Sequence, residues 1–470
     1  MTKRIKFGTD GWRAIIAKDF TVRNVAAVSL ACAAWINIKY KNPRVVIGYD
    51  TRFGGAMFAE TVTKVLALKG IEVITCDHFV PTPAVSYAIT VLDACFGIVI
   101  TASHNPASYN GFKLKGIHGG PLMEEEIRNI ENLINPELEI DLDQISIESL
   151  KEKGFVKYHD IEKLYITHLK NSFKMDLIAR SRFHFAFDPM FGSGQNIMKK
   201  ILPGVKCINS IPDPLFNGTS PEPLARNLKD FMTLMGRNQQ YDCGLVVDGD
   251  ADRIALVNSK GEYIDSHHVI LLLIHYLAGY RRQTGKIITG FSSTVKIEKL
   301  AAHYKLEVER VPIGFKDISK HMLNDDVLVG GEESGGIGVK GHIPERDGIW
   351  MGLLIWQLMA ESDKSLETLI GEIYSITGSF AFERSDLPLD KELKNRVIEK
   401  CKNNDFTHFG KYKVKTRSDL DGYKFFFDDN TWLMIRPSGT EPVLRIYAEA
   451  ATREETLIIL EEARKIIMTL

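Results

Sequence analysis

Cysteine is scarce in this chain of 470 residues, and no Cys-x-x-Cys pair occurs. Scattered cysteines in apolar runs are typical of buried side chains in a reducing compartment, and they argue against structural zinc or a disulfide framework. Long apolar runs are also missing, because the stretch 269–277 is short and is interrupted by His275. The cysteines are Cys32, Cys76, Cys95, Cys207, Cys243 and Cys401.

The chain has no excess of charge of either sign, and its start does not read as a leader segment. Its 59 Lys and Arg nearly balance its 60 Asp and Glu, so no nucleic-acid-binding surface is indicated. The charged start, residues 1–6, is followed by no apolar core, so we expect no signal peptide. We predict a soluble, cytoplasmic protein that binds small molecules and neither nucleic acid nor membranes. The sequence carries no indication of its oligomeric state.

The length predicts three or four domains, and the hydrophobic pattern predicts α/β units. Strands at 45–49, 71–74 and 96–101 alternate with helices at 56–69 and 84–92, which predicts a parallel sheet with right-handed crossovers. Residues 136–153 read as an acidic connector, and the pattern becomes α+β from about residue 381. Further strands are predicted at 183–187, 205–211, 244–247, 286–289, 306–310 and 327–329. The predicted domains are 1–150, 151–258, 259–380 and 381–470.

In each of the three α/β units a predicted strand ends in a polar loop. The first loop carries Ser103, the second, 248–253, carries three aspartates, and the third, 331–336, carries two glutamates. If the units are structural repeats, the loops lie at equivalent sheet ends and can converge on one cleft, where open α/β sheets place their ligands. Alone, each loop is also explained as a turn; Ser103 would then be a capping residue before Asn105-Pro106.

The second loop has the composition of a metal site. Asp248, Asp250 and Asp252 alternate, so in an extended loop all three carboxylates project to one side. Clustered carboxylates repel one another without a cation, and hard oxygen ligands suit Mg²⁺ or Ca²⁺. A calcium EF-hand would need glycine where Arg253 stands and glutamate where Ser259 stands. We therefore predict a Mg²⁺ site, with a solvated acidic turn as the alternative.

Other segments carry groups suited to a phosphorylated sugar. Arg436-Pro-Ser-Gly-Thr offers a guanidinium, two hydroxyls and backbone N–H groups, all donors for a phosphate. Arg253 can hold the aspartates or bind a phosphate, and Glu332 and Ser334 suit sugar hydroxyls. The Gly-x-x-x-x-Gly-Lys-[Ser/Thr] motif is absent, so ATP is not an evident phosphate donor. These features together indicate phosphoryl transfer through an enzyme-bound phosphate.

Four of these motifs resemble the α-D-phosphohexomutase family (phosphoglucomutase/phosphomannomutase type) in order and spacing. They are Thr101-Ala-Ser-His-Asn-Pro, Asp248-Gly-Asp-Ala-Asp-Arg, Gly331-Glu-Glu-Ser-Gly and Arg436-Pro-Ser-Gly-Thr. Residues 7–13 and 48–52 are similar to that family too. The resemblance covers the whole chain. It implies an α/β protein of four domains around a central cleft: three related α/β units, with the phosphoserine, metal and sugar loops in that order, and a C-terminal α+β domain that binds phosphate.

The resemblance also implies roles for individual residues. Ser103 would be the phosphoserine that donates and takes back the phosphoryl group, and it would hold Mg²⁺ together with Asp248, Asp250 and Asp252. His104, Lys113 and Arg13 match positions near the reacting hydroxyl, and all three are candidates for proton transfer or charge stabilisation. The implied substrate contacts are Glu332 and Ser334 for sugar hydroxyls, Arg436, Ser438, Gly439 and Thr440 for the non-reacting phosphate, and Lys316, Arg346 and Arg253 for phosphate or sugar.

The implied reaction is that of an isomerase, an intramolecular phosphotransferase of carbohydrate metabolism. Phosphoserine would donate to the free hydroxyl of a hexose monophosphate, and the resulting bisphosphate would turn over before returning a phosphate to Ser103. The implied cofactors are one Mg²⁺ per active site and glucose 1,6-bisphosphate as activator or intermediate. A closed cleft would keep water from the phosphoserine.

The sugar is indicated by the third loop. Glucosamine-phosphate branches of the family usually read Gly-Glu-Gln-Ser-Gly-His and dual mannose/glucose enzymes tend to carry His at the last position, where this chain has Gly336. Residues 314–316 and 345–350 look more like the glucose-preferring branch. We predict phosphoglucomutase, with phosphomannomutase or phosphoglucosamine mutase as alternatives. A sugar-phosphate-binding regulator without turnover is an alternative of a different class, and the intact Ser103 and aspartates argue against it.

Overall fold

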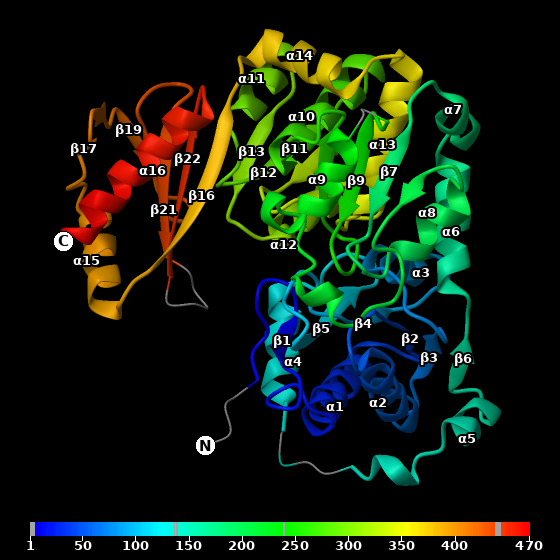
Figure 1. Cartoon of the computed structure of the whole chain (residues 1–470). Coiled ribbons are helices and arrows are strands. Elements are labelled where there is room, and N and C mark those ends of the chain that lie inside the picture. The colour runs from blue at the N-terminus through cyan, green and yellow to red at the C-terminus, as the bar shows by residue number, and fades with distance from the viewer. Residues whose placement is uncertain (1–4, 136, 138–139, 238–239, 438–442) are drawn as a thin grey trace.

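The computed structural model describes residues 5–135, 137, 140–237, 240–437 and 443–470. They form successive units, each built on its own main sheet (Figure 1). The sheets of the first three units are mixed and carry helices, and the sheet of the C-terminal unit is antiparallel. This confirms the predicted fold class, three α/β units followed by an α+β unit.

The first unit is built on a sheet with the strand order β1-β5-β4-β2-β3-β6. Its β4-β2-β3 part is parallel, as predicted, and β6, a strand that was not predicted, extends this part in parallel. The sheet as a whole is mixed, since β5 and β1, which were not predicted, run antiparallel to β4 and to β5 respectively. The connection 101–108 is too short for a parallel crossover. The elements are β1 (Trp12–Ile15), α1 (Val22–Lys39), β2 (Arg44–Tyr49), α2 (Gly55–Leu68), β3 (Glu72–Thr75), α3 (Thr82–Val91), β4 (Phe96–Ile100), β5 (Tyr109–Gly116), α4 (Glu124–Leu133), η1 (Leu142–Gln144), α5 (Ile147–Glu152) and β6 (Val156–Tyr158).

The second unit has the strand order β11-β10-β9-β7-β8. The strand predicted at 205–211 shrinks to the two-residue β8, because Asn209 is left-handed (φ 45°) and ends the extended run. The elements are α6 (Ile161–Ser172), α7 (Met175–Arg180), β7 (Phe185–Asp188), α8 (Gln195–Ile201), β8 (Lys206–Cys207), η2 (Phe216–Gly218), η3 (Ala225–Asn227), α9 (Lys229–Gly236), β9 (Cys243–Val247), β10 (Ile254–Asn258) and β11 (Tyr263–Ile264).

The third unit has the strand order β13-β12-β14-β15. The strands predicted at 286–289, 306–310 and 327–329 are found here with small shifts of their ends. The elements are α10 (Ser266–Ile274), the π-helix η4 (His275–Tyr280), β12 (Lys286–Gly290), α11 (Lys296–His303), β13 (Val308–Val311), α12 (Phe315–Asn324), β14 (Val327–Gly331), β15 (Ile337–Val339), α13 (Gly348–Ser362) and α14 (Leu366–Thr377).

The three α/β units share one local arrangement around their polar loops. A buried strand pairs in parallel with a neighbour on one side and is followed by the loop and an antiparallel return strand. The strands β4 and β5 flank 101–108, β9 and β10 flank 248–253, and β14 and β15 flank 332–336. The loops therefore occupy equivalent positions in three related sheets.

The C-terminal unit has the strand order β16-β22-β21-β20-β19, and all these pairs are antiparallel. It stands beside the third unit, with β16 along the junction (Figure 1). Phe291 of the third unit packs there against Trp432, Met434 and Tyr447. The elements are β16 (Ala381–Pro388), α15 (Lys391–Lys402), β17 (His408–Phe409), β18 (Tyr412–Lys413), β19 (Thr416–Ser418), β20 (Tyr423–Phe426), β21 (Trp432–Pro437), β22 (Val443–Ala450) and α16 (Arg453–Met468).

The hydrophobic cores connect the units unequally. The second and third units share one core, which also takes Val46 and Val99 from one face of the first sheet. The other face of the first sheet and the C-terminal sheet have cores of their own. Within the described part of the chain, no helix combines the length and apolar character that crossing a membrane requires.

Candidate active site

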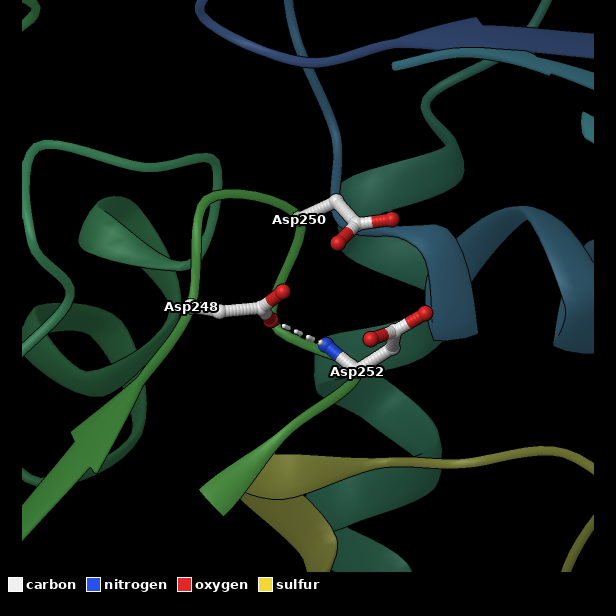
Figure 2. A group of neighbouring side chains, drawn as sticks. All are labelled: Asp248, Asp250 and Asp252. Atoms are coloured by element: carbon white, nitrogen blue, oxygen red, sulfur yellow. Dashed lines mark hydrogen bonds between the residues drawn. The ribbon is translucent and has the colours of Figure 1, made fainter. Parts of the chain in front are cut away.

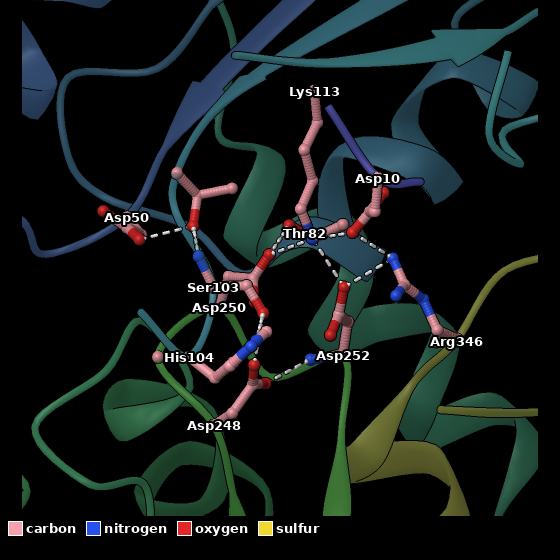
Figure 3. A network of polar contacts seen from close by, with 12 residues as sticks. Asp10, Asp50, Thr82, Ser103, His104, Lys113, Asp248, Asp250, Asp252 and Arg346 are labelled. Carbon is pink, nitrogen blue, oxygen red and sulfur yellow. Dashed lines mark hydrogen bonds and ion pairs between the residues drawn. The ribbon is translucent and has the colours of Figure 1, made fainter. Parts of the chain in front are cut away.

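The loop after β4 aims Ser103 at the second unit. Ser103 is fully buried and has a left-handed backbone with φ 53°. Its Oγ donates to Asp248 Oδ2 at 2.6 Å, and its backbone N–H donates to Thr101 Oγ1 at 2.9 Å (Figure 3). A left-handed non-glycine residue costs about 1–3 kcal/mol and persists only where surrounding contacts maintain it. The strain here accompanies a hydroxyl that faces a carboxylate of another unit.

The guanidinium of Arg52 maintains this loop. Arg52 and Asp50 are both buried, and they form an ion pair at 3.2 Å. Asp50 also accepts a bond from the Thr101 hydroxyl, and burial raises the pKa of its carboxyl to about 6. Arg52 donates to the carbonyl oxygens of Ser103 and Asn105 at 2.6 Å each, of Pro106 at 2.8 Å and of Tyr109 at 3.1 Å. The segment 48–52 is similar to a family motif, but nothing in its sequence predicts this positioning role of Arg52.

The predicted aspartates converge in a tight turn (Figure 2). Asp248, Asp250 and Asp252 each offer a carboxylate oxygen within 4.8 Å of the others, and all three are buried. The predicted extended loop is wrong, since residues 249–251 form a turn in which Ala251 has φ 60°. Asp248 Oδ1 accepts from the backbone N–H of Asp252 at 2.9 Å, which closes the turn. The convergence therefore comes from the turn and not from strand alternation.

The oxygens of this group fit a hard divalent cation. Among the described residues, Asp250 Oδ1 and Asp252 Oδ1 are buried without a hydrogen-bond donor. Burial, and then repulsion from the other two carboxylates, raises the pKa of Asp248 well above its usual value. Buried, clustered carboxylate oxygens without donors are the ligands that Mg²⁺ prefers. The residues present therefore fit the predicted Mg²⁺.

Two cations face the same carboxylates. The Nζ of Lys113, on β5, lies 2.7 Å from Asp250 Oδ2, 2.6 Å from Asp252 Oδ2 and 2.8 Å from Asp10 Oδ2. Arg346 Nη2 lies 2.6 Å from Asp10 Oδ2 and 2.8 Å from Asp252 Oδ2. Burial alone would lower the pKa of Lys113, but the carboxylates of Asp10, Asp250 and Asp252 raise it. Lys113 is therefore held as a cation within the network of Figure 3.

Asp10 and Thr82 belong to this network but were not predicted as site residues. Asp10 lies within the segment 7–13, whose similarity to the family does not by itself single out this residue. Its pKa is well below the usual value, since Arg346 and Lys113 outweigh the effect of burial. Thr82, at the start of α3, donates through Oγ1 to Asp250 Oδ2 at 2.5 Å. No local pattern in the sequence distinguishes Thr82 from any helix-starting threonine.

His104 and Arg13 also contact the serine loop. His104 Nδ1 is 3.3 Å from Ser103 Oγ, and desolvation followed by the charges of Arg253 and Arg13 holds the pKa of the imidazole well below its usual value. Arg13 Nη1 donates to Asn105 Oδ1 at 2.8 Å, and its Nη2 lies 3.6 Å from Asp10. Both predicted residues are thus brought to the serine loop, one at the hydroxyl and one at the side chain of Asn105.

The predicted sugar loop lies against the metal loop. Ile254 N donates to Gly335 O at 3.1 Å, and Arg253 forms a β-bridge with Gly336. Glu332 is buried, and burial followed by repulsion from Glu333 raises its pKa to about 7. A Cβ on Gly336 would lie 2.4 Å from Arg346 Cδ, so the histidine of other branches would displace Arg346 as it is placed here. Ser334 is half-buried at the turn of this loop.

Among the other predicted contact residues, Arg253 lies at the aspartates, where its backbone N–H donates to Asp248 Oδ1 at 3.1 Å, whereas Lys316 and Arg436 contact other segments. Arg253 Nη1 lies 3.5 Å from Glu222, and Lys316 Nζ donates to the carbonyl of Gly8 at 3.2 Å. Arg436, in the C-terminal unit, pairs with Asp421 at 3.1 Å. The remaining predicted phosphate-binding residues, Ser438, Gly439 and Thr440, lie outside the described residues.

The chain matches the domain models of one protein family along most of its length. The descriptions are phosphoglucomutase/phosphomannomutase, alpha/beta/alpha domain I over residues 4–141, domain II over 163–261, domain III over 265–376, and C-terminal domain over 392–466. These matches follow one another in the order of the four structural units. The domain boundaries predicted from the sequence stay a prediction.

Individual proteins are similar over nearly the full length. A phosphoglucomutase/phosphomannomutase of Thermococcus kodakarensis and a phosphoglucosamine/phosphogalactosamine mutase of Sulfurisphaera tokodaii are each 30% identical, with 98% of both chains covered. A crystal structure from Thermus thermophilus, assigned as a phosphomannomutase, has a TM-score of 0.87 and 31% identity, with both chains fully covered. The fold is shared with Paramecium parafusin (phosphoglucomutase) in an open form, at a TM-score of 0.81, 20% identity, and coverage of 100% of this chain and 95% of that one.

Proposed function

The chain belongs to the phosphoglucomutase/phosphomannomutase family and is a phosphohexomutase, and on this premise we propose that Ser103 carries the transferred phosphoryl group and that glucose is the preferred sugar. The substrates would be glucose 1-phosphate and glucose 6-phosphate, interconverted through glucose 1,6-bisphosphate. Glucose 1,6-bisphosphate would also activate the unphosphorylated enzyme, because it would phosphorylate Ser103.

One contact carries the assignment of Ser103. Its Oγ donates to Asp248 Oδ2 at 2.6 Å across 145 positions of sequence, so the hydroxyl lies at the carboxylate group that fits Mg²⁺. The hydroxyl is also fully buried, which supports a role as phosphoryl carrier because bulk water has little access to its ester. A serine of a capping turn would need neither contact nor burial.

The transfer follows from these positions. The bond between phosphorus and Ser103 Oγ breaks as the free hydroxyl of the hexose monophosphate bonds to phosphorus, and overall one proton passes from that hydroxyl to the released Ser103 Oγ. On return, Ser103 Oγ loses a proton as it is phosphorylated; His104 Nδ1, at 3.3 Å, is within reach to receive it. Lys113 and Arg346, as fixed cations beside the reacting group, would stabilise charge on the transferred phosphoryl group.

Asp248, Asp250 and Asp252, with an oxygen of the Ser103 phosphate, would hold Mg²⁺. When bound, the ion supplies positive charge that offsets the charge on the phosphoryl oxygens. Glu332 would accept hydrogen bonds from sugar hydroxyls, and Arg436 would bind the phosphate that does not react. Positioning and electrostatics would thus supply most of the lowering of the barrier.

Glucose is favoured by the third loop, whose last residue is Gly336 with the side chain of Arg346 packed over it. Glucosamine is the second candidate. Glu333, whose Oε2 accepts from Ser292 Oγ at 2.6 Å, adds a second carboxylate to this loop, and a carboxylate attracts the ammonium group of a 2-amino sugar. The names of similar proteins include both kinds of enzyme.

The decisive experiment is a coupled assay with Mg²⁺ and a trace of glucose 1,6-bisphosphate. We expect conversion of glucose 1-phosphate to glucose 6-phosphate by the wild-type chain and none by Ser103→Ala. Intact mass is expected to show one phosphate on Ser103 that is lost on addition of hexose monophosphate. Unchanged activity of Ser103→Ala would refute the mechanism. Mannose and glucosamine phosphates in the same assay test the sugar, and a higher kcat/KM for either would replace glucose.

A further inference from the structure

The carboxylate of Asp421 is shared between two units of the molecule. Asp421 lies between β19 and β20 of the C-terminal unit. Its Oδ1 accepts from Arg436 Nε at 3.1 Å, within the same unit, and its Oδ2 accepts from the backbone N–H of Ile313 in the third unit at 2.8 Å. One rigid carboxylate therefore sets the position of the Arg436 guanidinium relative to a loop of the neighbouring unit.

The surroundings of Asp421 are built around Arg436. Gly422 has φ 105°, and a Cβ there would lie 3.1 Å from Arg436 Cβ and 3.2 Å from Arg436 Cγ. Only glycine allows this close approach in that backbone conformation. Asp421 and Arg436 line a cavity of about 380 Å³. Because Asp421 accepts a hydrogen bond from Arg436 Nε, it orients the plane of the guanidinium, whose two terminal Nη groups form the fork that binds a phosphate end-on.

The loop that Asp421 binds, residues 313–316, contacts the sugar loop, Arg346 and the first unit. The Gly314 amide acts on the Glu332 carboxyl, where it lowers the pKa against the raising effect of burial. The guanidinium carbon of Arg346 lies 5.5 Å from the centre of the Phe315 ring, and Lys316 Nζ donates to Gly8 O at 3.2 Å. The 313–316 loop thus connects Arg436, through Asp421, to the sugar loop and to the first unit.

We propose that Asp421 is a positioning residue, which holds Arg436 at the correct distance and orientation from the sugar loop so that one substrate can bind to both. The proposal rests on the proposed function of Arg436 as a ligand of the non-reacting phosphate. Asp421 itself contacts no reacting atom. Its loss therefore weakens binding of the phosphorylated sugar and leaves the transfer at Ser103 intact, for hexose 1-phosphate and hexose 6-phosphate alike.

The variant Asp421→Asn tests this with little change of shape. Its amide keeps one oxygen for the Ile313 N–H, but its NH₂ group then faces Arg436 Nε, donor against donor. We expect KM for both hexose monophosphates to rise about tenfold with kcat unchanged. Asp421→Glu, which keeps the charge, is expected to fall between Asn and wild type. The matched control is Asp419→Asn, which removes a carboxylate paired with Arg417 at 3.4 Å in the same cavity wall, and it is expected to leave KM unchanged.

A double-mutant cycle with Arg436→Ala separates this proposal from the proposed function. If Asp421 acts through Arg436, then Asp421→Asn adds nothing to KM once Arg436 is alanine. If Arg436→Ala alone leaves KM unchanged, the proposed phosphate contact is wrong. If Arg436→Ala raises KM but Asp421→Asn does not, or if the two effects multiply, the phosphate contact stands and the positioning role of Asp421 is overturned.

Discussion

The clamp of Arg52 on the serine loop makes a strong prediction for the variant Arg52→Lys. Arg52 reaches the backbone carbonyls from both of its terminal nitrogens and pairs with Asp50 through Nε. An ammonium group is a compact charge without this planar fork, so roughly two of these bonds are lost. Each hydrogen bond to a charged group contributes roughly 1.5–3 kcal/mol, which gives a local loss of about 3–6 kcal/mol.

This loss acts on a loop that holds Ser103 in a strained left-handed backbone. A misplacement of about 1 Å at the reacting atom can lower the rate about 100-fold. We therefore expect Arg52→Lys to lower kcat about 100-fold in the coupled assay. KM for hexose phosphate is expected to stay unchanged, because Arg52 contacts no residue that is predicted to bind the substrate. The midpoint of thermal unfolding is also expected to fall.

The control for this variant is Arg182→Lys, since Arg182 pairs with Asp363 on the surface with 63% of its side chain exposed. It is expected to behave as wild type. A wild-type kcat and thermal midpoint for Arg52→Lys would refute the reasoning, since the loop would then hold its shape without the fork. A rise of KM at constant kcat would show instead that Arg52 binds substrate.

The metal loop and the sugar loop carry further predictions. Asp248→Asn relieves repulsion among buried carboxylates, so the thermal midpoint of the variant in EDTA is expected to equal or exceed that of wild type. Its affinity for Mg²⁺, measured from the Mg²⁺ dependence of activity, is expected to fall at least about 100-fold. A metal-free variant that is less stable than metal-free wild type would contradict this. For Glu332 the folded pKa of about 7 lies above its ordinary 4.5, so the folded state binds the extra proton and stability falls as pH rises from 4.5 to 7, by about 3 kcal/mol. Glu332→Gln removes this fall in stability. Between pH 5 and pH 8 the thermal midpoint is therefore expected to fall for wild type and not for the variant, and an equal fall in both proteins would refute the reasoning.

Local patterns predicted the strands and loops of the site well. The run 96–100 is apolar and wholly buried, and the polar motif directly after it is the serine loop. The same holds for the buried strand β9 and its aspartates. These predictions succeeded because burial of a strand and the polarity of the next turn are encoded in neighbouring residues.

Elements with an ambiguous pattern were missed. The helix α1 is buried on most of its surface, so it lacks the polar face from which an amphipathic helix is identified. The antiparallel strands β1 and β5 were also missed, since β5 contains Lys113 and Lys115, which are buried only because carboxylates from other segments pair with them. A buried lysine reads as a surface residue until its partner is known.

The sequence by itself determined which loops carry chemistry, since serine, aspartate and glutamate follow buried strands in a fixed order. Only the tertiary structure decided which charges meet. Arg346 pairs with Asp10 across 336 positions and Lys113 with Asp250 across 137, and the charge of Asp421 meets the backbone N–H of Ile313 across 108. Such contacts depend on how whole sheets pack, because a buried charge is stable only where packing brings its partner and excludes water. The spacing of residues along the chain does not show which partners packing will bring together.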